Sequence, residues 1–323
     1  MSTHRKAWLA AILAALSAGT IAAAGARRRY RRDLSAARTR LAETDTTRIA
    51  TAFGHIEYAE RGTGEPVLVS HGIFQGCESA LLFGGLFPGR RIIAPSRFGY
   101  LGSDIPPGAT PADQADAFVA LLDALGIDRI DVVGVSAGTT SVLQLALRHP
   151  ERVSHLVVLS GNLPGSPTAV VLPTWARLVD RQVPLWLIWT FLPSTMRFLS
   201  GVPRGLSVSA DDARFVTDFI DSLFPIEPRE QGVDFDGFVS NAAVNDYRLE
   251  AIDVPTLIVH AKDDPLVSYE AARRAAGRIP GARLVSLETG GHLLLGQTEV
   301  VRRELASFLS PSLAIQDRTP SYR

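Results

Sequence analysis

The stretch IDVVGVSAGTTSVLQLAL, residues 130–147, decides the fold of this chain. Its first part, residues 130–135, is apolar apart from Asp131 and Gly134, as expected for a buried strand of a parallel sheet. The part after Ser136 continues as a helix. Ser136 is the centre of Gly134-Val-Ser-Ala-Gly138, a Gly-x-Ser-x-Gly pattern that is typical of a sharp strand-to-helix turn exposing the serine hydroxyl.

Short apolar strands alternate with helices on both sides of this stretch, over residues 50–310. This alternation predicts an α/β fold with a mostly parallel sheet and helices on both of its faces. We expect further strands at residues 53–58, 66–70, 91–94, 155–159, 256–260 and 283–287, and further helices at residues 110–125, 269–278 and 298–309.

The alternation stops at about residues 162–246, inside the α/β domain. This segment carries Trp175, Trp186 and Trp189, several prolines and an apolar stretch at residues 183–192 that is too short to cross a membrane. We expect an inserted helical lid here. Its aromatic residues favour an apolar pocket beneath the lid, although core packing explains most of them more simply.

Residues 1–32 differ from the rest of the chain, because an uncharged run at residues 7–26 lies between basic residues. A helix of this length would span about 30 Å, the thickness of a bilayer core. We therefore predict a hydrophobic membrane anchor, and the arginines after the run favour a cytoplasmic catalytic domain. The alternatives are a signal peptide cleaved within residues 22–26, with export of the domain, and a disordered or amphipathic tail. Residues 33–49 are expected to form a linker, and the polar residues 311–323 a disordered tail.

The composition excludes several classes of function. The 323 residues carry 33 basic and 33 acidic side chains, so the chain has no net charge and we expect no nucleic-acid partner. Cys77 is the only cysteine, which rules out an intramolecular disulfide and leaves the redox compartment undecided. No partner motif accompanies Cys77, so we interpret it as a small buried hydrophobe and not as a second nucleophile.

A serine hydroxyl is a weak nucleophile at neutral pH, so Ser136 needs a base, and a neutral histidine is the natural choice. Of seven histidines, His292 is favoured because it follows Gly290-Gly291 just beyond the last strand, where a loop can carry it over the edge of the sheet. His71 and His260 end strands at the same edge and stay as alternatives.

The third member of the site must be a carboxylate that orients the histidine. Asp263 and Asp264 both follow the strand expected at residues 256–260. Their position favours Asp264, and Asp263 stays as the alternative. The chain order Ser136, Asp264, His292 is the one expected of this architecture.

An acyl-transfer site also needs donors for the oxyanion of the tetrahedral intermediate. The glycine-containing loop His71-Gly-Ile-Phe74 follows an early strand. We expect the backbone amides of Ile73 and Ala137 to be these donors, with Phe74 as the alternative to Ile73. The expected chemistry implies no metal ion and no organic cofactor.

Together these motifs resemble the α/β-hydrolase family over about residues 50–310, in particular its lid-bearing branch of serine hydrolases. That branch includes esterases, carbon–carbon bond hydrolases, cofactor-free haloperoxidases and proline iminopeptidases. The resemblance implies an eight-stranded sheet, Asp264 as the triad acid and the amide of Ile73 as an oxyanion donor. It rests on His71-Gly72, Arg97-Phe-Gly-Tyr-Leu-Gly-Ser103, the turn at Ser136, Asp263-Asp-Pro-Leu-Val267 and Gly290-Gly-His292.

The chain departs from the family's pattern at two positions. Ser96 stands where the family often has aspartate, and Ala261 stands where it often has glycine. The first change loosens a contact of the loop at Arg97, and the second alters the backbone beside Asp264. Epoxide hydrolases and haloalkane dehalogenases resemble this fold too, but they carry an aspartate at the turn, so Ser136 argues against both.

These residues predict a serine hydrolase that acts on a small apolar acyl substrate, a carboxylic ester or a related compound, through an acyl-enzyme intermediate. Carbon–carbon bond cleavage, perhydrolysis and acyl transfer to an alcohol are alternatives on the same fold. A non-catalytic protein that binds an apolar ligand in the lid pocket is a further alternative, because a fold alone does not establish function.

Overall fold

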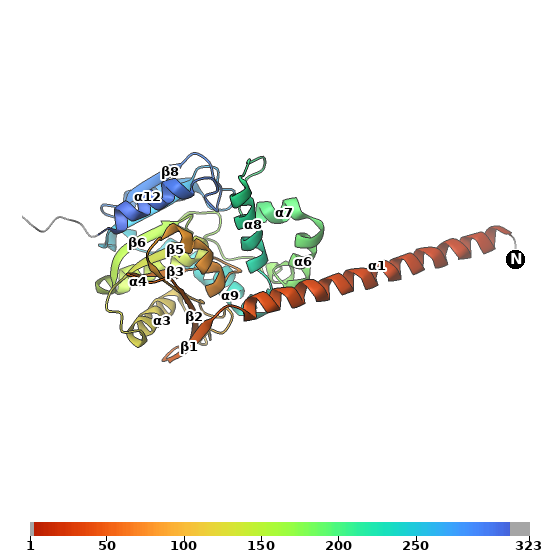
Figure 1. Cartoon of the computed structure of the whole chain (residues 1–323), viewed down its shortest axis with the longest axis horizontal. Helices are drawn as coiled ribbons and strands as arrows, with labels where there is room; N and C mark the ends of the chain where they lie inside the picture. The colour runs from red at the N-terminus through yellow and green to blue at the C-terminus, as the bar shows by residue number, and fades with distance from the viewer. Residues whose placement is uncertain (1–2, 311–323) are drawn as a thin grey trace, which may run out of the picture. The chain divides into compact units, whose positions relative to one another are not determined.

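The computed structural model describes residues 3–310, except for the side chains of residues 3–7 and 9–18 (Figure 1). The tail predicted at residues 311–323 lies outside the described residues. The chain divides into two units, Met1–Glu43 and Thr44–Arg323.

The first unit is a single helix, α1 (Thr3–Ala42), which includes most of the segment that the sequence assigned to a linker. No helix among the described residues is both long enough and apolar enough to cross a membrane. The membrane anchor predicted at residues 7–26 is therefore wrong, and the predicted membrane association and cytoplasmic placement lose their basis. The run has the necessary length, but Ala, Gly, Ser and Thr fill 14 of its 20 positions, so strongly apolar side chains are few.

The second unit contains an eight-stranded sheet with the strand order β1-β2-β4-β3-β5-β6-β7-β8. β2 pairs antiparallel with both β1 and β4, and all other neighbours pair parallel. This confirms the predicted mostly parallel α/β sheet. The strands are β1 (Thr46–Thr51), β2 (Gly54–Arg61), β3 (Pro66–Ser70), β4 (Arg91–Pro95), β5 (Ile130–Val135), β6 (Val153–Leu159), β7 (Thr256–Ala261) and β8 (Arg283–Leu287).

Helices cover both faces of the sheet. In Figure 1, α3 (Pro111–Ala124) and α4 (Thr139–Arg148) lie on one face and α12 (Thr298–Leu309) lies on the other. α3 begins with a capping box, in which the Thr110 hydroxyl accepts from the Asp113 amide and the Asp113 carboxylate accepts from the Thr110 amide. The shorter elements around them are α2 (Cys77–Ala80), η1 (Leu81–Leu86), η2 (Ser136–Gly138), η3 (Pro150–Arg152), η7 (Leu249–Ala251) and α11 (Tyr269–Arg278).

The parallel strands place the functional loops at one edge of the sheet. All residues of β5 and β7 are buried, which fixes these strands in the core. Since β3, β5, β6, β7 and β8 run parallel, their carboxyl ends meet at the same edge. His71 follows β3, Ser136 follows β5, and Asp264 comes in the loop after β7.

Helices fill the segment between β6 and β7, where the sequence predicted an insertion. Trp186 is 3% exposed whereas Trp175 is 63% exposed, so the tryptophans do not form one buried cluster. The elements are α5 (Ala176–Val179), α6 (Gln182–Phe191), α7 (Pro193–Leu199), α8 (Ala210–Ser222), η4 (Glu227–Arg229), α9 (Glu230–Phe235), the π-helical turn η5 (Asp236–Ser240), α10 (Asn241–Ala243) and η6 (Val244–Asp246).

Candidate active site

Ser136 directly follows β5 as the first residue of η2, in a tight turn with a backbone φ of +52°. Few non-glycine residues adopt this left-handed region, and such strain is common at functional positions. A Cβ on Gly134 would lie 2.5 Å from Val142 Cγ2, and a Cβ on Gly138 would overlap the carbonyl oxygen of Ser70. The turn therefore requires both glycines of the Gly-x-Ser-x-Gly pattern, which explains the spacing in the sequence.

His292 is held in its loop by contacts on both sides. Gly290 and Gly291 have φ values of +134° and +62°, and the Asp263 carboxylate accepts hydrogen bonds from both of their amides, at 3.3 and 2.8 Å. The His292 amide donates to the Gly201 carbonyl at 2.9 Å. The imidazole thus projects from a loop fixed to both the sheet edge and the inserted segment.

Asp264 is the aspartate that contacts this imidazole. Its Oδ2 lies 2.8 Å from His292 Nδ1, while its Oδ1 accepts from the amides of Leu266 and Val267 at 2.8 and 3.0 Å. Burial raises the pKa of the Asp264 carboxyl, but the imidazoles of His292 and His260 outweigh burial and hold the pKa well below its usual range. Asp264 is therefore ionised at neutral pH and accepts a hydrogen bond from Nδ1–H, which leaves Nε2 of His292 free to act as a base.

Ser136 and His292 line the same small cavity, of about 100 Å³, with Ile73 and Phe74 on its wall. Among the described residues no hydrogen bond joins the Ser136 hydroxyl to His292. Such bonds are often long in enzymes without substrate and shorten when substrate is bound. Ala137, the other predicted oxyanion residue, directly follows Ser136 and is buried.

The two alternative histidines are buried in supporting positions. His71 Nδ1 donates to the Gly72 carbonyl at 2.8 Å and its Nε2 accepts from the Arg97 amide at 2.9 Å. Burial and the charge of Arg97 hold the pKa of His71 well below its ordinary value, so its ring is neutral. His260 Nε2 lies 3.3 Å from Asp264 Oδ2 and 3.1 Å from the Val267 carbonyl. Both rings thus hold loops of the site in place.

Sequence reasoning missed two residues that border the cavity. Gln75 is 1% exposed, its Oε1 accepts from the Gly72 amide at 2.5 Å, and its Nε2 has no partner. Ser200, at the end of α7, has a buried hydroxyl without a partner. The position of Gln75 close after His71-Gly72 could have indicated its role, but no sequence signal connects Ser200 with the site.

A buried ion pair joins the loop after β4 to the inserted segment. The Arg97 guanidinium donates to both oxygens of Asp236, at 2.6 and 2.5 Å, and Tyr100 Oη donates to the same carboxylate. Arg97 Nε also donates to the His71 carbonyl at 2.9 Å. At the first departure from the family pattern, the Ser96 hydroxyl accepts from the Cys77 amide at 3.2 Å. Arg97 therefore connects the candidate oxyanion loop with η5.

Residues 65–297 match the family model described as the alpha/beta hydrolase fold. The chain belongs to the alpha/beta hydrolase family. It is a hydrolase, and among its described residues no His, Cys, Asp and Glu side chains are grouped to hold a metal ion.

Relatives of this hydrolase have similar lengths and folds. The 2-hydroxymuconate semialdehyde hydrolase of Pseudomonas putida is 29% identical over 79% of the chain and 91% of its own length. An alpha/beta hydrolase fold protein from Nakamurella multipartita is 29% identical, with a TM-score of 0.70 over 82% of this chain and 99% of its own. Est816, an N-acyl homoserine lactone degrading enzyme, is 26% identical, with a TM-score of 0.61 over 81% of this chain and 100% of its own.

Proposed function

We propose that this hydrolase cleaves a carboxylic ester or a related acyl substrate with Ser136 as nucleophile, His292 as general base and Asp264 as the orienting acid. The observation that carries the proposal is the 2.8 Å contact between His292 and the buried Asp264, on a histidine that lines one cavity with Ser136. The strained turn at Ser136 adds to it, because it presents the hydroxyl at the edge where these loops meet.

The reaction proceeds in two acyl-transfer steps. Ser136 Oγ attacks the carbonyl carbon while His292 Nε2 takes its proton, and the amides of Ile73 and Ala137 donate to the oxyanion. The intermediate collapses to an acyl-enzyme as His292 returns the proton to the leaving alcohol. Water then attacks the acyl-enzyme by the same route and releases the acid. Asp264 stays ionised throughout and stabilises the imidazolium.

The inserted helices serve as the lid of this site. Leu199 and Ser200 at the end of α7, and Phe219 and Leu223 at the end of α8, line the cavity with Ser136. Three of these four side chains are apolar, which suits a small apolar acyl group.

An ester substrate is favoured by the likeness to Est816, since a lactone is a cyclic ester. Hydrolysis of a carbon–carbon bond is the second candidate, because the chain is also similar to 2-hydroxymuconate semialdehyde hydrolase. Perhydrolysis and acyl transfer would use the same nucleophile and stay as further alternatives.

The test compares Ser136→Ala with the wild type on p-nitrophenyl butyrate and on a vinylogous diketone. We expect ester turnover in the wild type and a fall in kcat of at least about 10³-fold in the variant, with an unchanged Tm. The matched control is Ser286→Ala, an exposed serine on β8, which should keep wild-type kinetics. Turnover of the diketone alone would favour the second candidate, and unchanged ester turnover in Ser136→Ala would refute both.

A further inference from the structure

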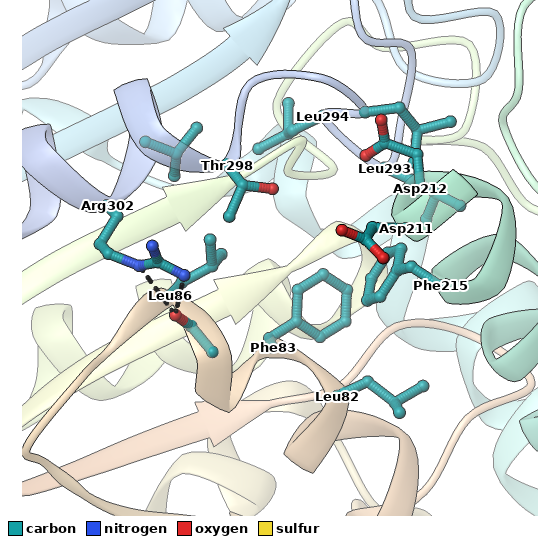
Figure 2. A pocket seen from close by; sticks show the side chains of 13 residues that line it. Leu82, Phe83, Leu86, Asp211, Asp212, Phe215, Leu293, Leu294, Thr298 and Arg302 are labelled. Atoms are coloured by element: carbon teal, nitrogen blue, oxygen red, sulfur yellow. Dashed lines mark hydrogen bonds between the residues drawn. The ribbon is translucent and has the colours of Figure 1, made fainter. Parts of the chain in front are cut away.

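A second cavity, of about 240 Å³, lies beside the catalytic one and is drawn in Figure 2. Its walls come from η1, from α8, and from the chain between His292 and α12. Figure 2 shows the rings of Phe83 and Phe215 next to each other, and their centroids are 5.9 Å apart in an edge-to-face arrangement. Leu82, Leu86 and Leu294 complete a mostly apolar lining.

The two cavities are neighbours along α8 and share one residue. Leu293, which directly follows His292, lines both of them. Phe215 borders the second cavity and Phe219, one helical turn later, borders the catalytic one, with ring centroids 6.4 Å apart. Leu293 and the Phe215–Phe219 pair therefore connect the linings of the two cavities.

The catalytic cavity alone is small for a substrate. Its volume of about 100 Å³ falls below the range of roughly 300–1,000 Å³ that is usual for ligand pockets. The second cavity, at about 240 Å³, brings the combined space into this range. Part of a substrate that is larger than a short acyl group must lie outside the catalytic cavity.

Two of the polar side chains at the margin of the second cavity, Arg302 and Asp212, have partners within the protein. Arg302 donates through Nε and Nη2 to the Gly85 carbonyl, at 3.1 and 3.0 Å, as Figure 2 shows. The Asp212 carboxylate accepts from the Gly296 amide at 3.1 Å and takes part in the N-terminal cap of α8. Asp211 and Thr298 are the other polar residues of the lining, and the remaining side chains are mostly Leu, Phe and Val, so the cavity suits an apolar ligand.

We propose that this second cavity is a subsite for an unbranched apolar chain of the substrate, on either its acyl or its alcohol side. The inference rests on the proposed function, since it assumes a substrate bound at Ser136. It adds a substrate class, namely medium-chain esters, which the catalytic residues alone do not specify.

The kinetic test fills or enlarges the subsite without changing a catalytic residue. Leu82→Trp reduces the space in the second cavity, and Phe215→Ala increases it. Leu178→Trp is the matched control, because it makes the same leucine-to-tryptophan change at a position on α5 that is 74% exposed. Two substrate series distinguish the sides: p-nitrophenyl butyrate to octanoate, and ethyl to octyl acetate. Thermal unfolding of every variant checks that it is folded.

Each buried methylene group should raise kcat/KM about fourfold in the wild type, in one of the two series. In that series, the ratio of kcat/KM for the longest and shortest ester should fall at least about tenfold in Leu82→Trp. The ratio should equal the wild-type ratio in Leu178→Trp. In Phe215→Ala, kcat/KM should reach its maximum at a longer chain than in the wild type. Ratios unaffected by Leu82→Trp in both series would overturn the subsite.

A binding measurement separates failure of the subsite from failure of the proposed function. Calorimetry compares the single variant Ser136→Ala with the double variant that also carries Leu82→Trp. The double variant should bind 1-octanol at least about fivefold more weakly. Equal binding would overturn the subsite even if the wild type hydrolyses esters. If the wild type hydrolyses none, the ester proposal fails, and the binding of 1-octanol alone decides whether the cavity takes an apolar chain.

Discussion

Asp263 and Asp264 are neighbours in the chain, yet their carboxylates support the site in different ways. Asp264 contacts the His292 ring, whereas Asp263 accepts hydrogen bonds from the two glycine amides that shape the histidine loop. Loss of Asp264 would thus leave the imidazole without its orienting partner, and loss of Asp263 would loosen the loop that carries it.

Gln75 provides a test of the candidate oxyanion loop at the residue scale. In Gln75→Leu, the Gly72 amide loses its acceptor and the cavity loses its free Nε2 donor. We expect kcat/KM for p-nitrophenyl butyrate to fall at least about tenfold, which corresponds to about one good hydrogen bond. Gln231→Leu, at an exposed glutamine, is the control. Wild-type kinetics in Gln75→Leu would show that the side chain does not support the reaction.

The predicted site residues lie where the strand pattern suggested, because each follows the end of a parallel strand or a glycine turn. Ser136, Asp264 and His292 could be proposed from the sequence, since each comes with a local motif. Gln75 was missed although it closely follows the His71-Gly72 motif, and Ser200 could not be proposed, because only the packed structure shows its buried hydroxyl without a partner. Leu293 lines two cavities, which likewise depends on packing and could not be predicted from the sequence.

At the scale of elements, the Arg97–Asp236 pair connects the loop after β4 to η5, and both side chains are fully buried. Asp236→Ala would leave a buried guanidinium charge without compensation. We expect the free energy of unfolding to fall by about 3–5 kcal/mol in a urea titration. Glu270→Ala, which breaks an exposed pair with Arg273 on α11, should have a much smaller effect. A similar small effect of both changes would contradict the role of the buried pair.

Apolar strands and capped helices were predictable because their patterns are local. The bounds of β3, β5, β8, α11 and α12 coincide with those expected from the sequence. β1 was missed, because its residues, TTRIAT, are mostly polar and the strand lies at the edge of the sheet, where it pairs only with β2. The extension of α1 to Ala42 was missed as well, since no proline or glycine pattern marks its end.

At the scale of the whole molecule, His71 makes stability depend on pH. In the folded protein its pKa lies well below the ordinary value, mainly because the ring is buried. In the unfolded chain the ring takes up a proton below about pH 6.5. Below about pH 6.5 the unfolded state thus binds more protons than the folded state. The contribution of His71 to stability is complete above about pH 6.5 and is lost as the pH falls toward the folded-state pKa.

This contribution should decrease by about 1.4 kcal/mol per pH unit below about pH 6.5. In urea titrations at several values between about pH 5 and 7, His71→Gln should therefore show a shallower loss of stability than the wild type. Ser286→Ala, at an exposed position on β8 that carries no titratable group, should keep the wild-type slope. An identical slope in His71→Gln would contradict the neutral buried ring.

Two predictions concerned the whole molecule, the family and the membrane anchor, and only the family is confirmed. The family could be inferred, because five motifs occur in one order along the chain, and the comparison bears this out. The membrane anchor was inferred from length and flanking charge, and this prediction is wrong, because no helix among the described residues is both long enough and apolar enough to cross a membrane.

The central claim is that Ser136 is a nucleophile activated by His292. The most direct measurement is peptide mass spectrometry after brief exposure to a fluorophosphonate, with the wild type and His292→Ala treated in parallel. We expect a covalent adduct on Ser136 in the wild type and labelling slower by at least about 10²-fold in His292→Ala. Absence of the adduct from Ser136, or equal labelling rates in the two proteins, would contradict the central claim.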